Sequence, residues 1–241
     1  MAIVITGGGS AVAEREALEC FARLLGDERP VLYLPVALKR RAGYPETAIA
    51  WLAATLGQVG VGRFETWASL DGRHAAELDA FSALFIGGGN TFDLLAELRA
   101  SGLARAVSEF ERRGGAVFGG SAGAIVLGAS IETALHCDTN LAGLSDPTGL
   151  DLLAGHDVWC HFEEQHRAAL SRYVRAVGHP VLALEEGAGL LIDQGALRPL
   201  GSRGRALWHA SGESEALEEG RAWPSRETPA GTPPEDCGEE E

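Results

Sequence analysis

The stretch that decides the fold is Ala116-Val117-Phe118-Gly119-Gly120-Ser121-Ala122-Gly123-Ala124. It begins as a short apolar strand and continues into a segment of helical periodicity. Between the two lies G-x-S-x-G, the pattern of a nucleophile elbow, in which a sharp turn lifts a serine clear of the backbone. The pattern predicts Ser121 as a nucleophile and the N–H of Ala122, at the start of the helix, as an oxyanion donor. A tight packing turn without any catalytic role is the alternative reading of the same residues.

A second glycine turn precedes the elbow by about thirty residues, in Leu84-Phe85-Ile86-Gly87-Gly88-Gly89-Asn90-Thr91-Phe92. It has neither the G-x-G-x-x-G spacing nor the lysine of a phosphate-binding loop, so the sequence does not favour nucleotide binding. We expect the N–H of Gly88 or Gly89 to be a second oxyanion donor. We expect Asn90 and Thr91, which follow it, to contact the substrate.

Short apolar runs alternate with helical segments on both sides of these turns. The expected strands are residues 2–6, 31–35, 64–67, 81–86 and 116–118, and the expected helices are residues 17–25, 47–56 and 91–113. This alternation predicts an α/β fold with a mostly parallel sheet and helices on both faces. After residue 130 the pattern loosens, with short strands expected at 157–160, 181–184 and 190–193 and a helix at 168–177. The later strands are candidates for antiparallel pairing.

The net charge of −14 is unevenly distributed and argues against nucleic acid or an anionic membrane as a partner. Residues 211–241 hold ten acidic residues against two arginines. We therefore expect a single α/β hydrolytic domain over residues 1–210 and an acidic tail over 211–241, largely disordered from about residue 222. Neither a secretory leader nor an apolar run of membrane-spanning length is evident, which predicts a cytoplasmic protein.

The four cysteines are too few and too scattered for a disulfide scaffold. Cys137 and Cys160 each adjoin a histidine, but adjacent residues rarely chelate one ion with good geometry. We expect no metal and no cofactor. A homodimer or higher homo-oligomer is expected from the prevalence of symmetric assemblies alone.

The two glycine motifs together resemble the dipeptidase E and cyanophycinase family of serine peptidases, over roughly residues 1–200. The resemblance implies a flavodoxin-like sheet of the class I glutamine amidotransferase type. It also implies a serine nucleophile paired with a downstream histidine, in an enzyme that needs no metal.

The family's histidine lies in a Pro-His-Phe-like segment after a short strand, which here is Trp159-Cys160-His161-Phe162. The resemblance therefore assigns His161 as the base, and histidine suits this role near neutral pH. For the third member, Leu184-Glu185-Glu186-Gly187-Ala188-Gly189 resembles the cyanophycinase-like segment and indicates Glu186. Dipeptidase E-like enzymes take an aspartate soon after the elbow, which makes Asp138 the alternative.

The resemblance is weaker where substrate specificity is concerned. Dipeptidase E reads an N-terminal aspartate with an arginine beyond the histidine, but the corresponding segment here is shortened and acidic, with Arg167 as a substitute candidate. Arg40, in a cationic run after the second strand, is a second candidate for a substrate carboxylate. A strict preference for N-terminal aspartate is therefore not expected.

The sequence thus predicts a serine peptidase that hydrolyses short peptides, as a dipeptidase or small-peptide exopeptidase, or with carboxypeptidase-like action, through an acyl-enzyme on Ser121. Two alternatives remain open. One is an esterase of the α/β-hydrolase fold, in which Ser121, Asp138 and His161 have the expected chain order. The other is a non-catalytic module of the same amidotransferase-like fold that binds a small metabolite.

Overall fold

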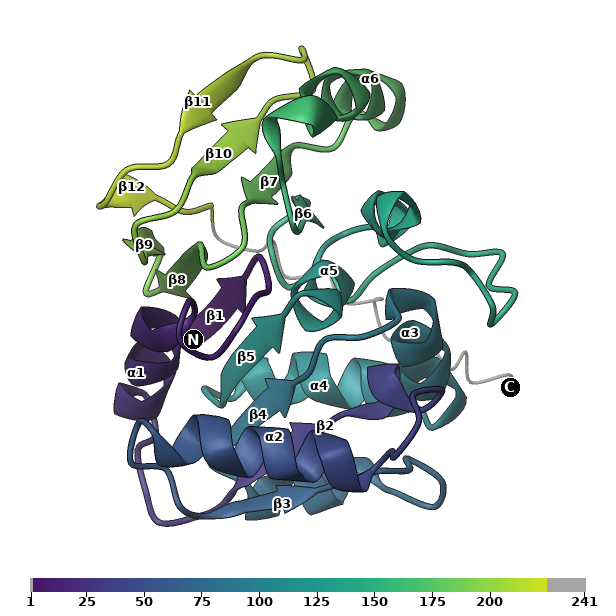
Figure 1. Cartoon of the computed structure of the whole chain (residues 1–241), viewed down its shortest axis with the longest axis vertical. Helices are drawn as coiled ribbons and strands as arrows, with labels where there is room; N and C mark the ends of the chain where they lie inside the picture. Colours follow the sequence, from purple (N-terminus) through teal and green to yellow (C-terminus); the bar gives the residue numbers. More distant parts are fainter. Residues whose placement is uncertain (1, 225–241) are drawn as a thin grey trace, which may run out of the picture.

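The computed structural model describes residues 2–224, and its centre is a sheet of eight strands (Figure 1). The strand order is β12-β9-β8-β1-β5-β4-β2-β3. These strands are β1 (Ala2–Thr6), β2 (Val31–Leu34), β3 (Phe64–Thr66), β4 (Ala83–Ile86), β5 (Ala116–Gly120), β8 (Gly189–Asp193), β9 (Ala196–Leu200) and β12 (Arg221–Ala222). The five strands from β1 to β3 in this order pair parallel, whereas β8, β9 and β12 add antiparallel at one edge.

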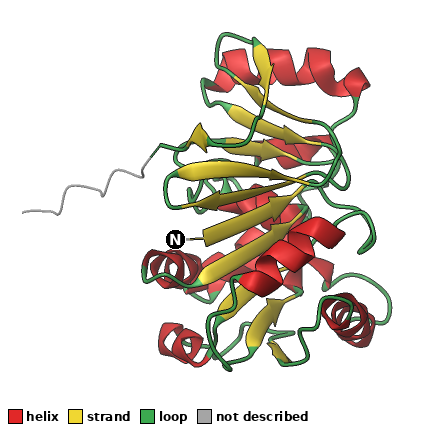
Figure 2. Ribbon diagram, turned by 90° about the vertical axis from the view of Figure 1, so that its left-hand side faces the viewer, coloured by secondary structure: helices red, strands yellow, loops and turns green. Residues whose placement is uncertain are grey.

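Both faces of the parallel strands are buried beneath helices, as Figure 2 shows with the sheet seen from the side. The helices are α1 (Arg15–Arg23), α2 (Glu46–Gly57), α3 (Thr91–Ala100), α4 (Leu103–Arg112) and α5 (Ala122–Leu127), with short turns η1 (Val36–Leu38), η2 (Ala75–Ala80) and η3 (Glu132–His136). Strand residues alternate between the two faces: Val4 packs in the cluster with α1 and α2, and Ile3 and Ile5 pack in the cluster with α3, α4 and α5. The predicted mostly parallel sheet with helices on both faces is confirmed.

A second sheet of four strands, in the order β11-β10-β7-β6, continues from the first. It contains β6 (Asp157–Trp159), β7 (Val181–Leu184), β10 (Arg205–Trp208) and β11 (Ser214–Ala216), and α6 (Arg167–Val177), preceded by η4 (Glu164–His166), packs against it. The strand at 189–193 pairs antiparallel with β1, but β6 and β7 pair parallel with each other in this second sheet. The short strands β9 to β12 are not indicated by the apolar pattern of the sequence.

The structure differs from the sequence prediction in two further places. The helix predicted over residues 91–113 is two helices, because Gly102 adopts φ of +74° between α3 and α4 and ends the first one. Residues 211–224, which the acidic composition groups with the tail, form β11 and β12, and Trp223 is buried. The rest of the predicted tail, residues 225–241, lies outside the described residues.

Candidate active site

Ser121 stands between the end of β5 and the start of α5, in a backbone conformation that L-residues rarely adopt. Its φ is +50° and its ψ is −113°, and its N–H donates to the carbonyl oxygen of Thr6 at 3.2 Å. A Cβ atom at Gly123 would lie 2.2 Å from the carbonyl oxygen of Ile86, and one at Gly119 would lie 2.7 Å from that of Gly123. The glycines of the G-x-S-x-G pattern are therefore required by the close approach of α5 to the sheet.

His161 follows β6 and faces the serine. Its Nε2 lies 2.8 Å from Ser121 Oγ, and its backbone also has a positive φ, of +52°. Its N–H donates to the carbonyl oxygen of Gly7 at 3.1 Å. The loop after β6 is thereby fixed to the loop after β1, and the imidazole is directed at the serine hydroxyl.

Glu186, in the turn between β7 and β8, completes a hydrogen-bonded chain. Its Oε1 lies 2.9 Å from His161 Nδ1. Because a carboxylate only accepts hydrogen bonds, Nδ1 carries the proton in this pairing and Nε2 is left to accept from Ser121 Oγ–H. The Glu186 side chain is 65% exposed and that of His161 33% exposed, so this pair is partly solvated.

Asp138, the alternative third member, lies in a different set of contacts. Its Oδ2 accepts hydrogen bonds from the N–H of Thr91 at 2.8 Å and from Thr91 Oγ1 at 2.7 Å. Thr91 is the first residue of α3, and Asn90 caps this helix by accepting a hydrogen bond from the N–H of Asp93 at 2.9 Å. The Asn90 amide donates to the carbonyl oxygen of Thr139. The structure therefore brings Glu186 to His161, and uses Asp138, Asn90 and Thr91 to hold the start of α3 to the loop after η3.

The residues expected to supply oxyanion donors, Ala122 and either Gly88 or Gly89, have different surroundings. A Cβ atom at Gly88 would lie 3.3 Å from Ser121 Cβ, so this backbone lies against the nucleophile. Ala122 is the first residue of α5, where an N–H has no acceptor within the helix. Gly89 instead packs against η1, since a Cβ there would lie 2.4 Å from the carbonyl oxygen of Ala37.

The two arginines expected to read the substrate have protein partners. Arg40 makes a bidentate pair with the buried Asp93, with Nε 2.6 Å from Oδ2 and Nη2 2.9 Å from Oδ1. Hydrogen bonding to Asp93 raises the pKa of Arg40. Arg167 pairs with Glu164, and its guanidinium lies 5.3 Å from the ring centre of Trp208. Neither guanidinium is brought to Ser121 by these contacts.

The loop after β1, Gly7–Gly9, contacts all three parts of the site. No role for this loop is predicted from the sequence. The carbonyl oxygen of Gly7 accepts from His161, and that of Gly8 accepts from the N–H of Gly187 at 2.8 Å. A Cβ atom at Gly8 would lie 2.5 Å from His161 Cε1 and 3.2 Å from Ser121 Cβ. The glycine run at the end of the first strand was the available signal, since carboxyl ends of parallel strands share an edge.

His136, which also follows the elbow in sequence, contacts the segment before His161 and not Ser121. Its Nε2 is 3.0 Å from the carbonyl oxygen of Cys160, and its ring stacks on Trp159. Burial lowers the pKa of His136. Within residues 2–224, no group of three or more His, Cys, Asp or Glu side chains is arranged to hold a metal ion.

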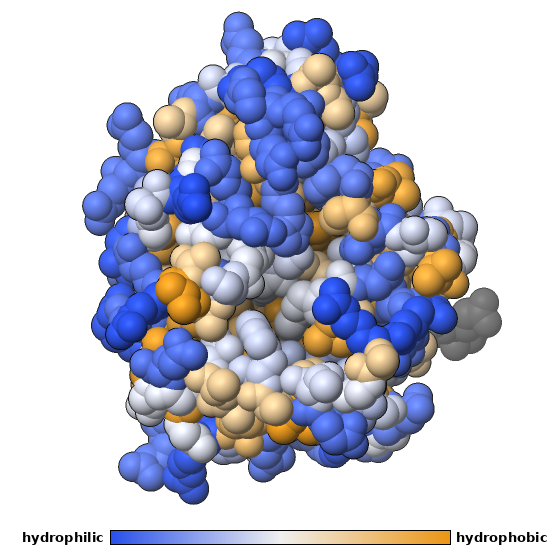
Figure 3. All heavy atoms as spheres, in the orientation of Figure 1, coloured by the Kyte–Doolittle hydropathy of each residue, from blue (hydrophilic) through white to orange (hydrophobic). Residues whose placement is uncertain are grey.

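In the space-filling view, pale residues of intermediate hydropathy gather at the centre of the face, between hydrophilic areas (Figure 3). β1, β4 and β5 end in this part of the molecule in Figure 1. None of the described helices has both the length and the apolar character needed to span a membrane.

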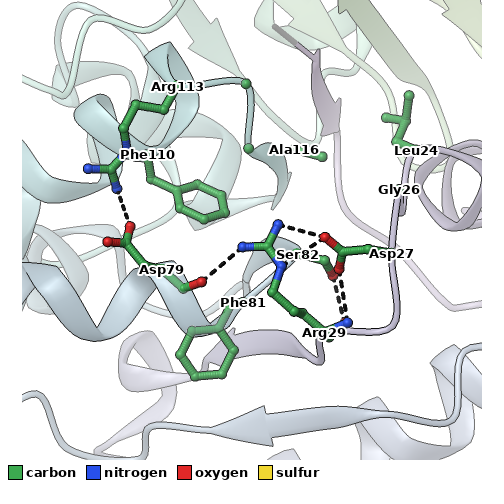
Figure 4. A pocket seen from close by; sticks show the side chains of 12 residues that line it. Leu24, Gly26, Asp27, Arg29, Asp79, Phe81, Ser82, Phe110, Arg113 and Ala116 are labelled. Carbon is green, nitrogen blue, oxygen red and sulfur yellow. Dashed lines mark hydrogen bonds and ion pairs between the residues drawn. The ribbon is translucent and has the colours of Figure 1, made fainter.

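A separate cavity of about 220 Å³ opens at the amino ends of β4 and β5 (Figure 4). Ser121 follows the carboxyl end of β5, so the cavity lies at the opposite end of these strands. Arg29 pairs with Asp27 at 2.7 Å and donates to the carbonyl oxygen of Asp79, and Arg113 pairs with the Asp79 carboxylate at 2.8 Å. We call this the amino-edge cavity. Its charges pair with one another, and it contains none of the residues that the sequence singles out for catalysis.

Comparison with known proteins gives a consistent family of relatives. The model of peptidase family S51 matches residues 3–200. Peptidase E of Escherichia coli O6:K15:H31 (strain 536 / UPEC) is 32% identical over 142 residues, and Peptidase E of Shigella sonnei (strain Ss046) is 32% identical over 145 residues. Each alignment covers 57% of this chain and 56% of the relative, so the chain matches only about half the length of these curated proteins.

Two solved structures share the fold. A peptidase from an acI-B1 Actinobacterium aligns with a TM-score of 0.67 and 19% identity, covering 92% of this chain and 95% of that one. A Listeria monocytogenes EGD-e protein aligns with a TM-score of 0.65 and 18% identity, covering 84% of this chain and 98% of that one. At these identities the likeness establishes the fold, which is the flavodoxin-like arrangement expected from the sequence.

Proposed function

Because this chain belongs to peptidase family S51, we propose that it is a serine peptidase that hydrolyses short peptides through an acyl-enzyme on Ser121. The family match confirms the resemblance to dipeptidase E that the two glycine motifs indicate. The observation that supports the proposed mechanism most directly is the hydrogen-bonded chain from Ser121 Oγ through His161 to Glu186.

In the first half-reaction, His161 Nε2 accepts the proton of Ser121 Oγ as this oxygen attacks the peptide carbonyl carbon. The N–H groups of Ala122 and of Gly88 or Gly89 hold the negative oxygen of the tetrahedral intermediate. Glu186 stabilises the imidazolium through Nδ1–H. The imidazolium then gives its proton to the leaving amine as the C–N bond breaks.

In the second half-reaction, water attacks the acyl-enzyme. His161 accepts a proton from this water and returns it to Ser121 Oγ as the acyl–oxygen bond breaks, which releases the carboxylic acid product. The same two hydrogen bonds therefore support both steps. Glu186, rather than Asp138, is the proposed third member because it is the carboxylate that contacts His161.

The proposed specificity is broader than N-terminal aspartate. A substrate carboxylate would have to displace Asp93 from Arg40, or Glu164 from Arg167, before it could pair with either guanidinium. We expect kcat/KM for an Asp-first dipeptide to lie within about tenfold of that for its Ala-first counterpart, a difference of about 1.4 kcal/mol in transition-state binding. A preference of a hundredfold or more for Asp would contradict this part of the proposal.

The test of the mechanism is mass-spectrometric product analysis on a mixed panel of free and N-blocked di- to pentapeptides. The wild type and the matched control Ser108→Ala, a half-buried serine on α4, are expected to cleave members that Ser121→Ala leaves intact. The N-blocked members report whether a free amino end is read. Cleavage that persists in Ser121→Ala would contradict the proposal, and hydrolysis of short acyl esters without peptide turnover would replace it with an esterase.

A further inference from the structure

Glu14 is a buried carboxylic acid for which the proposed mechanism has no use. It is the residue immediately before α1, and it is only 4% exposed. Its side chain makes no capping bond to the helix, and within the described residues Oε1 has no hydrogen-bond partner. Burying such a group costs free energy, which is why most buried polar atoms in folded proteins are paired. A glutamate buried in this position is therefore a candidate for a functional role.

The surroundings of Glu14 connect it to all three parts of the site. The Thr6 hydroxyl lowers the pKa of Glu14, although among residues 2–224 neither Thr6 Oγ1 nor Glu14 Oε1 makes a hydrogen bond of normal geometry. The carbonyl oxygen of Thr6 accepts from the N–H of Ser121 at 3.2 Å and from the thiol of Cys160, which precedes His161. Ala13, the residue before Glu14, packs against the turn that carries Glu186, since a Cβ atom at Gly187 would lie 3.1 Å from Ala13 Cβ and 3.2 Å from its carbonyl oxygen. The charge of Glu186 accordingly raises the pKa of Glu14.

We propose that Glu14 is a positioning residue of this site, which supports the Ser121–His161–Glu186 arrangement as a neutral acid and disrupts it once ionised. This inference rests on the proposed function. Ionised Glu14 would place a second negative charge beside Glu186. Because the Glu186 side chain is 65% exposed, it has room to turn towards solvent and leave His161 Nδ1 without its acceptor.

The titration of Glu14 places this change near neutral pH. Burial raises the pKa of Glu14 to about 7, the Thr6 hydroxyl lowers it in part, and the charge of Glu186 raises it further. Burial also raises the pKa of the Cys160 thiol well above its ordinary value, so that neighbour stays neutral. Among the described groups that act on Glu14, the charged one is therefore Glu186.

The experiment measures the rate at which a fluorophosphonate probe labels Ser121 between pH 6 and pH 9, which needs no knowledge of the peptide substrate. In the wild type, we expect the rate to fall about tenfold above pH 7 as Glu14 ionises. Glu14→Gln has the same shape and cannot ionise, so its labelling rate should not fall above pH 7. Glu19→Gln, on the exposed side of α1, is the matched control and should follow the wild type.

A second variant tests the same idea in the opposite direction and serves if Glu14→Gln does not fold. Thr6→Val removes the hydroxyl that favours ionised Glu14, so the fall in labelling should move to higher pH. The same pH dependence in wild type, Glu14→Gln and Thr6→Val would overturn the role of Glu14 while leaving the serine mechanism intact. Absence of labelling in the wild type at every pH would instead overturn the proposed function, and the role of Glu14 with it.

Discussion

Charged and polar side chains lie at both ends of the parallel strands, but the two ends differ in whether these side chains have partners. At the amino-edge cavity, Arg29 and Arg113 pair with carboxylates or carbonyls of the same cavity. At the carboxyl ends, Ser121 and His161 both have positive φ, and the buried Glu14 has one oxygen without a hydrogen-bond partner among the described residues. Backbone strain and unsatisfied polar groups cluster at functional sites, because such costs persist only where a structure over-determines them. We infer from this comparison that the amino-edge cavity, whose charges are paired, has a structural role.

The largest effect on this comparison is expected from removing the proposed base, His161. His161→Ala should lower kcat/KM by about 10⁴-fold, because Ser121 loses the group that takes its proton. Members of a catalytic unit act together, so the double variant with Ser121→Ala should be little worse than either single variant. Steady-state kinetics on the best peptide of the panel would measure both. A loss in the double variant equal to the product of the single losses would mean that the two residues act independently.

The next largest effect is expected from the third member. Glu186→Gln keeps the shape but removes the charge that stabilises the imidazolium, and we expect a loss of about 10²- to 10³-fold in kcat, since this pair is partly solvated. Asp138→Asn should instead weaken the start of α3, costing about 1 kcal/mol of unfolding free energy. Kinetics and chemical denaturation of the two variants separate these roles. The reverse pattern would make Asp138 the orienting residue.

The raised pKa of Glu14 predicts that the stability of the wild type and that of Glu14→Gln depend differently on pH. Its pKa is raised from 4.5 to about 7 by burial, so between these values the native state holds more protons than the unfolded state. The stabilisation from this group is therefore complete below about pH 4.5 and is lost as the pH rises through 7, a change of about 3 kcal/mol at most. The unfolding free energy of the wild type, measured relative to Glu14→Gln, should fall by that amount between pH 4 and pH 8. Parallel pH profiles of the two proteins would contradict it.

A methyl group added to the glycine loop tests how tightly the site is packed. Gly8→Ala would place a Cβ 2.5 Å from His161 Cε1 at φ of +89°, which should displace the imidazole and lower kcat by about 10²-fold. Gly114→Ala, in the lining of the amino-edge cavity, meets no atom of residues 2–224 within 4 Å at φ of +95°, so it should cost about 1 kcal/mol of stability through backbone strain alone. Equal loss of activity in both would show that the effect of Gly8 is general destabilisation.

The elbow could be predicted from the sequence because it is local: strand, turn and helix lie within nine consecutive residues. The partners of Ser121 could not be derived in this way. His161 is 40 residues from Ser121, and Glu186 is 25 residues from His161, so their meeting depends on how the second sheet joins the first. Both Glu186 and Asp138 lie in loops after the elbow. The resemblance of residues 184–189 to the family segment favours Glu186 but leaves Asp138 as the alternative, and the hydrogen bond from His161 to Glu186 supports the first of the two.

Other differences have equally local causes. Gly102 marks the break between α3 and α4, but the apolar periodicity continues across it and conceals the break. The acidic composition of residues 211–224 predicts a tail, but two apolar residues of this segment are buried. Leu217 and Trp223 are each only 5% exposed. No motif of the sequence singles out Glu14, which lies before the helix expected at residues 17–25. Its burial follows from the neighbouring loops, which no pattern within α1 reveals.

The smallest expected effect is at the amino-edge cavity itself. Arg113→Ala removes the pair with Asp79, whose side chain is 67% exposed, and surface pairs of this kind contribute about 0–1 kcal/mol. We therefore expect a change in unfolding free energy of less than about 1 kcal/mol and kcat/KM within about twofold of the wild type. Denaturation and kinetics on one preparation test both. A loss of activity beyond tenfold would show that this edge of the sheet is coupled to Ser121, and satisfied charges would then be no guide to which end of the strands is the structural one.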